Sequence, residues 1–239
     1  MQIINSKLKE KALKILYKDK ILNCAMINLL NDNKISEIEI YKNCVAIKQN
    51  RSEGWVHLSA NDINELKDFI PFIKNEKYFA ATNTEFVNII ANNKKIIWQE
   101  NCYKLAYLEN KAFTIKKYPP LTISNTNIVN DFWPYKSEYS LDYVKTRIKD
   151  GESVGYFIGD KLISWIITQD DGAMGFFHTL KSYRRKGYGE KITKYLINKL
   201  IENKKIPFVY VIIKNKNSLS LTQKLNFKII GKVSWFELS

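Results

Sequence analysis

The stretch that decides the fold runs from Met174 to Asn203 and reads MGFFHTL (174–180), KSY (181–183), RRKGYG (184–189) and EKITKYLINKLIEN (190–203). Its first segment is short, apolar and rich in aromatic residues, and a turn signal precedes it, so the pattern predicts a β-strand. In the last segment, Ile192, Leu196 and Leu200 recur at the spacing of one helix face. The sequence therefore predicts a strand that runs into a helix through a basic turn with two glycines.

This turn has the properties of an anion-binding site. The first amides of a helix have no partner within it, and the helix dipole leaves partial positive charge there. Gly187 and Gly189 lack side chains that would hold an anion away, and the basic run 184–186 adds charge. We expect a phosphate or pyrophosphate ligand, with a purely structural turn as the alternative. No Gly-Lys-Ser/Thr follows, and Ile192 stands where a dinucleotide fingerprint needs a third glycine, so neither nucleotide motif is matched.

The same residues carry a resemblance. Arg184-x-x-Gly187-x-Gly189 after a strand resembles the acyl-coenzyme A motif of the GNAT superfamily of N-acyltransferases, in which the cofactor's pyrophosphate lies on these amides. Downstream, Asn215-x-x-Ser218 followed by Lys224-Leu-Asn-Phe227 is similar to the helix that flanks the cofactor in that family. Segments 128–133, 164–166 and 172–174 resemble the glycine N-acyltransferase-like branch. The resemblance extends over residues 121–238 and is thin before them.

The resemblance implies an α/β fold with a mixed sheet, built as two GNAT-like folds in tandem. We expect an N-terminal domain without a cofactor motif at 1–115, and a C-terminal domain at 116–239 that binds acyl-coenzyme A and performs catalysis. Two parallel strands, 174–180 and 208–213, would splay apart to admit the pantetheine arm. The implied cofactor-binding residues are Thr179, Leu180, Arg184, Arg185, Lys186, Gly187, Tyr188, Gly189, Asn215 and Ser218.

The reaction implied is attack of an amine on a thioester, which needs a base, donors for the oxyanion and a proton for the departing thiolate. The family's tyrosine acid falls on Thr222, whose hydroxyl is a poor proton donor, and the glutamate of glycine N-acyltransferases falls on Ala173. Asp170 and Asp171 lie nearby in a turn. His178 is the candidate base, and a histidine hydrogen-bonded within a half-buried sheet is the alternative.

Composition narrows the function classes. The 239 residues are 45% hydrophobic and 26% charged, as in globular proteins, and no apolar run approaches the ~18 residues of a membrane span. The first residues show no secretory signal, so we expect a cytoplasmic protein. Three cysteines and two histidines stand far apart, so we expect neither a disulfide framework nor a metal site. The net charge of +14 attracts anions, but without a reader motif it does not indicate a nucleic-acid partner.

Periodicity and turn signals predict the remaining elements. In the first half these are two helices within 6–31, strands at 38–40, 45–47 and 55–58, a helix capped at Asn61-Asp62 and ended by Pro71, a strand at 78–81, a helix at 84–91 with Thr82 or Asn83 near its cap, and a hairpin of 95–98 with 103–108.

The second half follows the candidate linker Pro119-Pro120. It predicts a helix capped by Ser140 and ended before Gly151, a hairpin of 154–158 with 162–168, the strand, turn and helix described above, a strand at 208–213 buried on both faces, a helix at Asn215, and strands at 227–231 and 233–237.

These observations predict an N-acyltransferase that moves an acyl group from acetyl-coenzyme A or another acyl-coenzyme A to a primary amine of a small molecule or peptide, by direct attack in a ternary complex. The alternative is a non-catalytic domain that binds or senses acyl-coenzyme A, because the usual glutamate and tyrosine are missing. Neither the amine acceptor nor the oligomeric state is indicated by the sequence.

Overall fold

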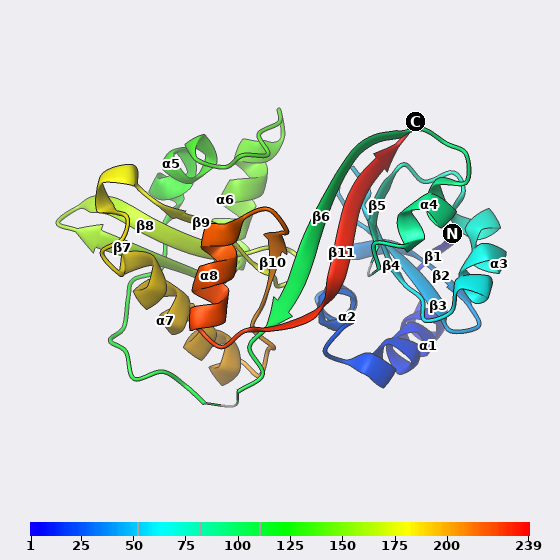
Figure 1. Ribbon diagram of the computed structural model, residues 1–239, viewed down its shortest axis with the longest axis horizontal. Coiled ribbons are helices and arrows are strands. Elements are labelled where there is room, and N and C mark those ends of the chain that lie inside the picture. Colours follow the sequence, from blue (N-terminus) through cyan, green and yellow to red (C-terminus); the bar gives the residue numbers. More distant parts are fainter. Residues whose placement is uncertain (52, 82, 110) are drawn as a thin grey trace. The chain divides into compact units, whose positions relative to one another are not determined.

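The chain forms two compact units, which we describe from a computed structural model covering residues 1–51, 53–81, 83–109 and 111–239 (Figure 1). Unit 1 comprises Met1–Leu105, Tyr210–Lys216 and Ile229–Ser239, and unit 2 comprises Ala106–Val209 and Asn217–Lys228. Both units are therefore built from stretches that are distant in the sequence. A division into tandem domains at residue 115 stays a prediction.

The described residues contain two sheets. The eight-stranded sheet has the order β1-β2-β3-β4-β5-β11-β6-β10, and the three-stranded sheet has the order β7-β8-β9. The pair β4–β5 is parallel, whereas β1–β2, β2–β3, β3–β4 and β5–β11 are antiparallel, so the larger sheet is mixed, as predicted. Its strands are β1 (Gln2–Ile3), β2 (Ile35–Tyr41), β3 (Cys44–Gln49), β4 (Val56–Ser59), β5 (Tyr78–Ala81), β6 (Ile96–Ala106), β10 (Phe208–Ile212) and β11 (Lys228–Leu238).

Two helix pairs form separate cores with this sheet in unit 1. The helices α1 (Ser6–Leu16) and α2 (Cys24–Asn31) bury apolar side chains with β2 and β3. The helices α3 (Ile63–Ile73) and α4 (Phe86–Ala91) pack with β3, β4, β5 and β11. Within the second core, Phe79 and Phe236 stack at 5.2 Å and join neighbouring strands.

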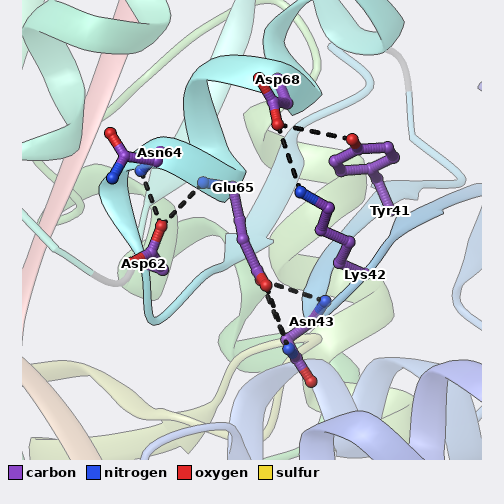
Figure 2. Close-up of polar contacts among 7 residues, drawn as sticks. All are labelled: Tyr41, Lys42, Asn43, Asp62, Asn64, Glu65 and Asp68. Atoms are coloured by element: carbon purple, nitrogen blue, oxygen red, sulfur yellow. Dashed lines mark hydrogen bonds and ion pairs between the residues drawn. The ribbon is translucent and has the colours of Figure 1, made fainter.

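Polar contacts attach the β2–β3 turn to α3, as Figure 2 shows. Asp62 caps the helix as predicted, because its side chain accepts hydrogen bonds from the backbone amides of the first turn. Farther along the helix, Asp68 accepts from Lys42 at 3.3 Å, and Glu65 accepts from both nitrogens of Asn43. The polar contacts drawn thus either cap α3 or fix the β2–β3 turn against it.

Unit 2 places helices against a short antiparallel sheet. Its strands are β7 (Ser153–Ile158), β8 (Lys161–Thr168) and β9 (Met174–Thr179), and its helices are α5 (Thr126–Asp131), α6 (Ser140–Asp150), α7 (Tyr188–Glu202) and most of α8 (Lys216–Lys224). Apolar side chains of α5 and α6 share a core with Trp165 and Ile167 of β8, while α7 packs along β7, β8 and β9. The predicted hairpin of β7 and β8, and the strand, turn and helix that follow, are confirmed.

Several helices begin or end at other residues than the sequence predicts. Helix α3 continues through Pro71, and α6 begins at Ser140 with Tyr139 as its cap residue. Helix α4 begins at Phe86 rather than at 84. Of its two predicted cap residues, Asn83 accepts a hydrogen bond from the amide of Glu85, which precedes the helix. The other, Thr82, lies outside the described residues.

The hairpin predicted at the end of the first half, and the two last strands predicted for the second half, are each one continuous strand. The predicted strands 95–98 and 103–108 fall on β6, which runs unbroken over 96–106, and the predicted strands 227–231 and 233–237 fall on β11, which runs unbroken over 228–238. In Figure 1, β6 (green) and β11 (red) run side by side, in agreement with the sheet order. The hydroxyl of Ser234 donates to Asn101 Oδ1 at 2.6 Å, so a polar residue in the middle of β6 has a partner on β11.

Strand β10 also differs from the prediction. It pairs with β6 at the edge of the larger sheet, and three of its five residues are only partly buried. The expectation of a strand buried on both faces is therefore wrong, whereas its splaying apart from 174–180 to admit a pantetheine arm stays a prediction.

Candidate active site

The end of strand β9 is irregular. Trp165 of β8 pairs with His178, and Ile167 pairs with Gly175, so Phe176 and Phe177 of β9 together oppose the single residue Ile166. This is a β-bulge, and Phe176 has the left-handed φ of 51° that such a residue can require. A bulky residue in this region is strained, and such strain is common at functional sites. No sequence signal indicated the bulge, because the glycine that would suggest it stands one residue earlier.

His178 packs in a cluster with two aromatic rings, which also contact each other. Its imidazole stacks on Phe132 at 4.4 Å and on Trp165 at 5.0 Å between ring centroids. Nε2 is buried and has no hydrogen-bond partner among the described residues. Burial, and secondarily the positive charge of Arg184, lower the pKa of His178 below its ordinary value. The imidazole is therefore neutral at pH 7 and can accept a proton only weakly.

The opposite face of the sheet carries a pair of hydroxyl groups. Ser164 Oγ lies 2.7 Å from Thr179 Oγ1 and donates to the carbonyl of His178 at 2.9 Å. One residue farther along, the amide of Leu180 donates to Ile163 O at 2.9 Å. The amide hydrogen of Leu180 is therefore already used within the protein, whereas the side chain of Thr179 lies toward α7.

The predicted basic turn joins β9 to α7. After a short 3-10 helix (Lys181–Tyr183), the exposed run Arg184–Lys186 leads to Gly187, which is the N-cap residue of α7. Arg184 Nε donates to the carbonyl of Thr179 at 2.9 Å, so this side chain is anchored to the strand end. Arg185 and Gly187 both have left-handed backbone angles, with φ of 60° and 77°.

Glycine is required at the two positions of the turn for different structural reasons. A Cβ atom on Gly187 would meet nothing within 4 Å, so its surroundings are open and only its φ favours glycine. A Cβ atom on Gly189 would lie 2.5 Å from Phe177 Cζ and 3.2 Å from Thr179 Oγ1. Gly187 thus gives access to the start of the helix, whereas Gly189 allows the helix to pack closely against β9.

The start of α7 is electrostatically suited to an anion. No side chain caps it, so its first amides keep the capacity to bind a ligand. The only acidic residue of its first turn, Glu190, is paired with Lys194 at 2.9 Å and Lys224 at 2.6 Å. Hydrogen bonds from these two lysines lower the pKa of Glu190, and they offset its charge. The ring of Tyr188 packs on Tyr156 at 4.6 Å and so fixes the first residue of the helix to β7.

Helix α8 places its predicted site residues unevenly. Thr222 is 8% exposed, and its hydroxyl donates to Leu219 O at 2.9 Å within the same helix. Ser218 lies in the first turns of α8 in unit 2, whereas Asn215 precedes the helix and belongs to unit 1. Unit 2 alone therefore brings together Thr179, Leu180 and the whole turn 184–189, and a role for Asn215 stays a prediction.

The aspartates before β9 have structural partners. Asp170 pairs with the buried Arg147 at 2.8 Å, and Asp171 accepts from the amide of Ala173 at 2.9 Å. Ala173 itself is fully buried. Both carboxylates thus shape the turn around Gly172, in agreement with the usual role of an Asp-Asp-Gly sequence.

Comparison with known proteins identifies the fold. The family model described as FR47-like protein matches residues 153–236, which contain β7 through β10 and most of β11. No protein among the curated proteins matches the chain. A solved Drosophila protein is 15% identical, with a TM-score of 0.76 over 100% of this chain and 98% of its own. An acetyltransferase of the GNAT family from Colwellia psychrerythraea is 12% identical, with a TM-score of 0.59 over 100% and 99%.

A GCN5-related N-acetyltransferase from Kribbella flavida is also 12% identical, with a TM-score of 0.59 over 90% of this chain and 95% of its own. The fold is that of the GNAT acetyltransferases. Because these solved chains are covered almost completely, the likeness extends over both units rather than only over the matched segment 153–236. A tandem arrangement of two such folds fits the length of 239 residues.

In the described ranges, no helix has the length and apolar character required to span a membrane. The same ranges hold no group of three or more His, Cys, Asp or Glu side chains arranged to bind a metal ion.

Proposed function

We propose that this protein is an N-acyltransferase that transfers an acyl group, in the first instance acetyl, from acyl-coenzyme A to a primary amine. The observation that carries the proposal is the start of α7. There an uncapped helix end, the open space at Gly187 and the exposed cations 184–186 lie together at the end of β9. Such an arrangement suits a pyrophosphate, because backbone amides, helix dipole and formal charge all favour a doubly charged anion. The GNAT fold and the FR47-like match are consistent with this ligand.

The proposed reaction requires no covalent intermediate on the protein. The amine nitrogen attacks the thioester carbonyl, a tetrahedral oxyanion forms, and the carbon–sulfur bond breaks to release the coenzyme A thiolate. Binding both substrates in one complex would supply most of the acceleration through proximity. Within the fold, the segments around Trp133, Trp165 and Met174 support the glycine N-acyltransferase-like branch.

His178 is our candidate for the proton acceptor. It is neutral at pH 7, and it lies on β9 directly before Thr179, on the face of the sheet opposite to the hydroxyl pair. The buried Thr222 is not suited to donate a proton to the thiolate, since its hydrogen is given to Leu219 O. We propose that the thiolate leaves unassisted or takes its proton from water.

The test is calorimetric titration with acetyl-coenzyme A and with free coenzyme A, followed by thiol release with a panel of primary amines. Binding with thiol release supports the transferase. Binding without release over a wide panel would favour a protein that only binds or senses acyl-coenzyme A. Failure of wild-type protein to bind either ligand at physiological salt would overturn the assignment of the turn.

A further inference from the structure

We propose that Ser164 is a positioning residue for the phosphate turn and acts through Thr179. This inference rests on the proposed function, since it concerns the turn that would hold the pyrophosphate. Ser164 is fully buried in the central strand of the three-stranded sheet, where it touches neither the open space at Gly187 nor the basic run. Its effect on a ligand must therefore pass through other residues.

The direction of the hydrogen bonds follows from the number of protons. A hydroxyl group has one hydrogen, and Ser164 donates its hydrogen to the carbonyl of His178. In the 2.7 Å contact between the two hydroxyls, Thr179 must therefore be the donor and Ser164 the acceptor. This arrangement fixes the rotamer of Thr179 and leaves its oxygen with only acceptor capacity toward α7.

Thr179 in turn makes two contacts with the turn. Its carbonyl accepts from Arg184 Nε at 2.9 Å, which holds the guanidinium by one nitrogen and leaves its two terminal nitrogens to bind a ligand. Its Oγ1 lies close to Gly189, since a Cβ atom there would come within 3.2 Å. Thr179 thus contacts both ends of the motif: its carbonyl anchors the side chain of Arg184, and its hydroxyl, held by Ser164, lies against Gly189.

The structure offers a matched control in the same sheet. Ser153 is a buried serine at the start of β7 whose hydroxyl accepts from the amide of Leu121 at 3.1 Å, away from the turn. Ser164→Ala and Ser153→Ala each remove one buried hydroxyl from one strand of the sheet. Both are expected to lower the melting temperature by a similar amount, so a difference in ligand binding between them cannot be assigned to stability.

The experiment compares acetyl-coenzyme A with S-acetyl-pantetheine, which lacks every phosphate. We expect Ser164→Ala and Thr179→Val to bind acetyl-coenzyme A roughly three- to tenfold more weakly than wild type, as for the loss of one hydrogen bond. Their KM for S-acetyl-pantetheine should stay at the wild-type value. Thr179→Ser keeps the hydroxyl and should restore binding, while Ser153→Ala should bind acetyl-coenzyme A normally. Arg184→Lys should behave like Ser164→Ala, because one ammonium nitrogen replaces three guanidinium nitrogens.

The outcomes separate this inference from the proposed function. If wild type binds acetyl-coenzyme A and Ser164→Ala binds it equally well, Ser164 is a structural residue only. An equal loss for S-acetyl-pantetheine would also overturn the inference, since the effect would not then pass through the phosphates. If wild type itself does not bind acetyl-coenzyme A, the proposed function fails and the inference fails with it.

Discussion

Phe177 and Gly189 are in direct contact where β9 meets α7: a Cβ atom on the glycine would lie 2.5 Å from Cζ and 2.9 Å from Cε2 of the phenyl ring. Phe177 belongs to the bulge of β9, and Gly189 is the second residue of the helix. The bulge and the start of the helix are therefore one steric unit. Any side chain at 189 must displace the ring or move the helix.

Gly189→Ala is therefore expected to weaken acetyl-coenzyme A binding about tenfold or more, because the first amides of α7 shift. The melting temperature should fall little, since Phe177 is 39% exposed and little buried contact is lost when the start of α7 shifts. A second substitution, Phe177→Ala, should restore part of the affinity, because it removes the atom that collides. Calorimetry on wild type, both single variants and the double variant measures this coupling. Additive losses in the double variant would show that the two positions act independently.

At Gly187 the conformation, and not the space, is limiting. Gly187→Val should lower the free energy of unfolding by about 1–2 kcal/mol, the cost of a left-handed φ for a residue with a Cβ atom. Gly187→Asn should cost less, because asparagine tolerates this region. Chemical denaturation of the two variants measures the difference. Equal losses would mean that φ at 187 changes in solution.

The lowered pKa of His178 makes a prediction about the pH dependence of turnover. A base must be deprotonated, so activity should persist as pH falls through 6.5 and decline only below it. His178→Ala should abolish most turnover at neutral pH while the affinity for acetyl-coenzyme A changes little. The measurement is kcat/KM against pH for wild type, with titration of the variant. Full turnover in His178→Ala would identify the histidine as a structural residue.

Thr222→Val should leave turnover unchanged. The hydroxyl is buried and donates to a backbone carbonyl of its own helix. Valine removes this one hydrogen bond, so the free energy of unfolding should fall by about 0.5–1.5 kcal/mol. Steady-state kinetics beside thermal unfolding separates the two effects. A large fall in kcat at unchanged stability would contradict this and would make Thr222 a proton donor.

His57 predicts acid sensitivity of the fold. It is 4% exposed, and burial, with the charges of Lys104 and Arg51, lowers its pKa to about 3. His57 takes up a proton near pH 6.5 in the unfolded chain but not in the folded chain. The free energy of unfolding is therefore unaffected by this residue above pH 6.5 and decreases as pH falls from 6.5 toward 3. Between pH 6.5 and 4 the loss should be about 3 kcal/mol. Urea unfolding over this range should show a shallower decline for His57→Gln than for wild type.

The central strand, turn and helix could be predicted because every signal there is local. Apolar periodicity, a glycine pair and a run of charges coincide within thirty residues, and β9 and α7 follow them closely. The cap of α3 at Asp62 was equally accessible, since the aspartate bonds to amides two and three residues away.

The limits of β6 and β11 depend on partners that are distant in sequence. Asn101 looks like a turn residue, yet it continues β6 because Ser234 and the amide of Ile213 bond to it. Gly231 looks like a break, yet it lies within β11, where a Cβ atom would come 3.0 Å from a methyl group of Leu22. Local propensity cannot report either contact.

In the candidate site, the charged turn was visible in the sequence, but its support was not. The strain at Phe176, the hydroxyl pair of Ser164 and Thr179, and the anchoring of Arg184 each depend on how β8 and β9 are registered. A one-residue change of register would place these side chains on the other face. The sequence therefore indicated which ligand to expect more readily than which residues hold the site in shape.

The order of strands in the larger sheet has a consequence for synthesis on the ribosome. The two neighbours of β6 in the sheet are β11 and β10. Both are translated only after β7, β8, β9 and α7. Unit 1 cannot complete its sheet until β10 and β11 have been synthesised. Until then, β5 and β6 have backbone edges without a paired strand. We expect the first hundred residues, expressed alone, to aggregate or to recruit a holding chaperone until β11 is supplied.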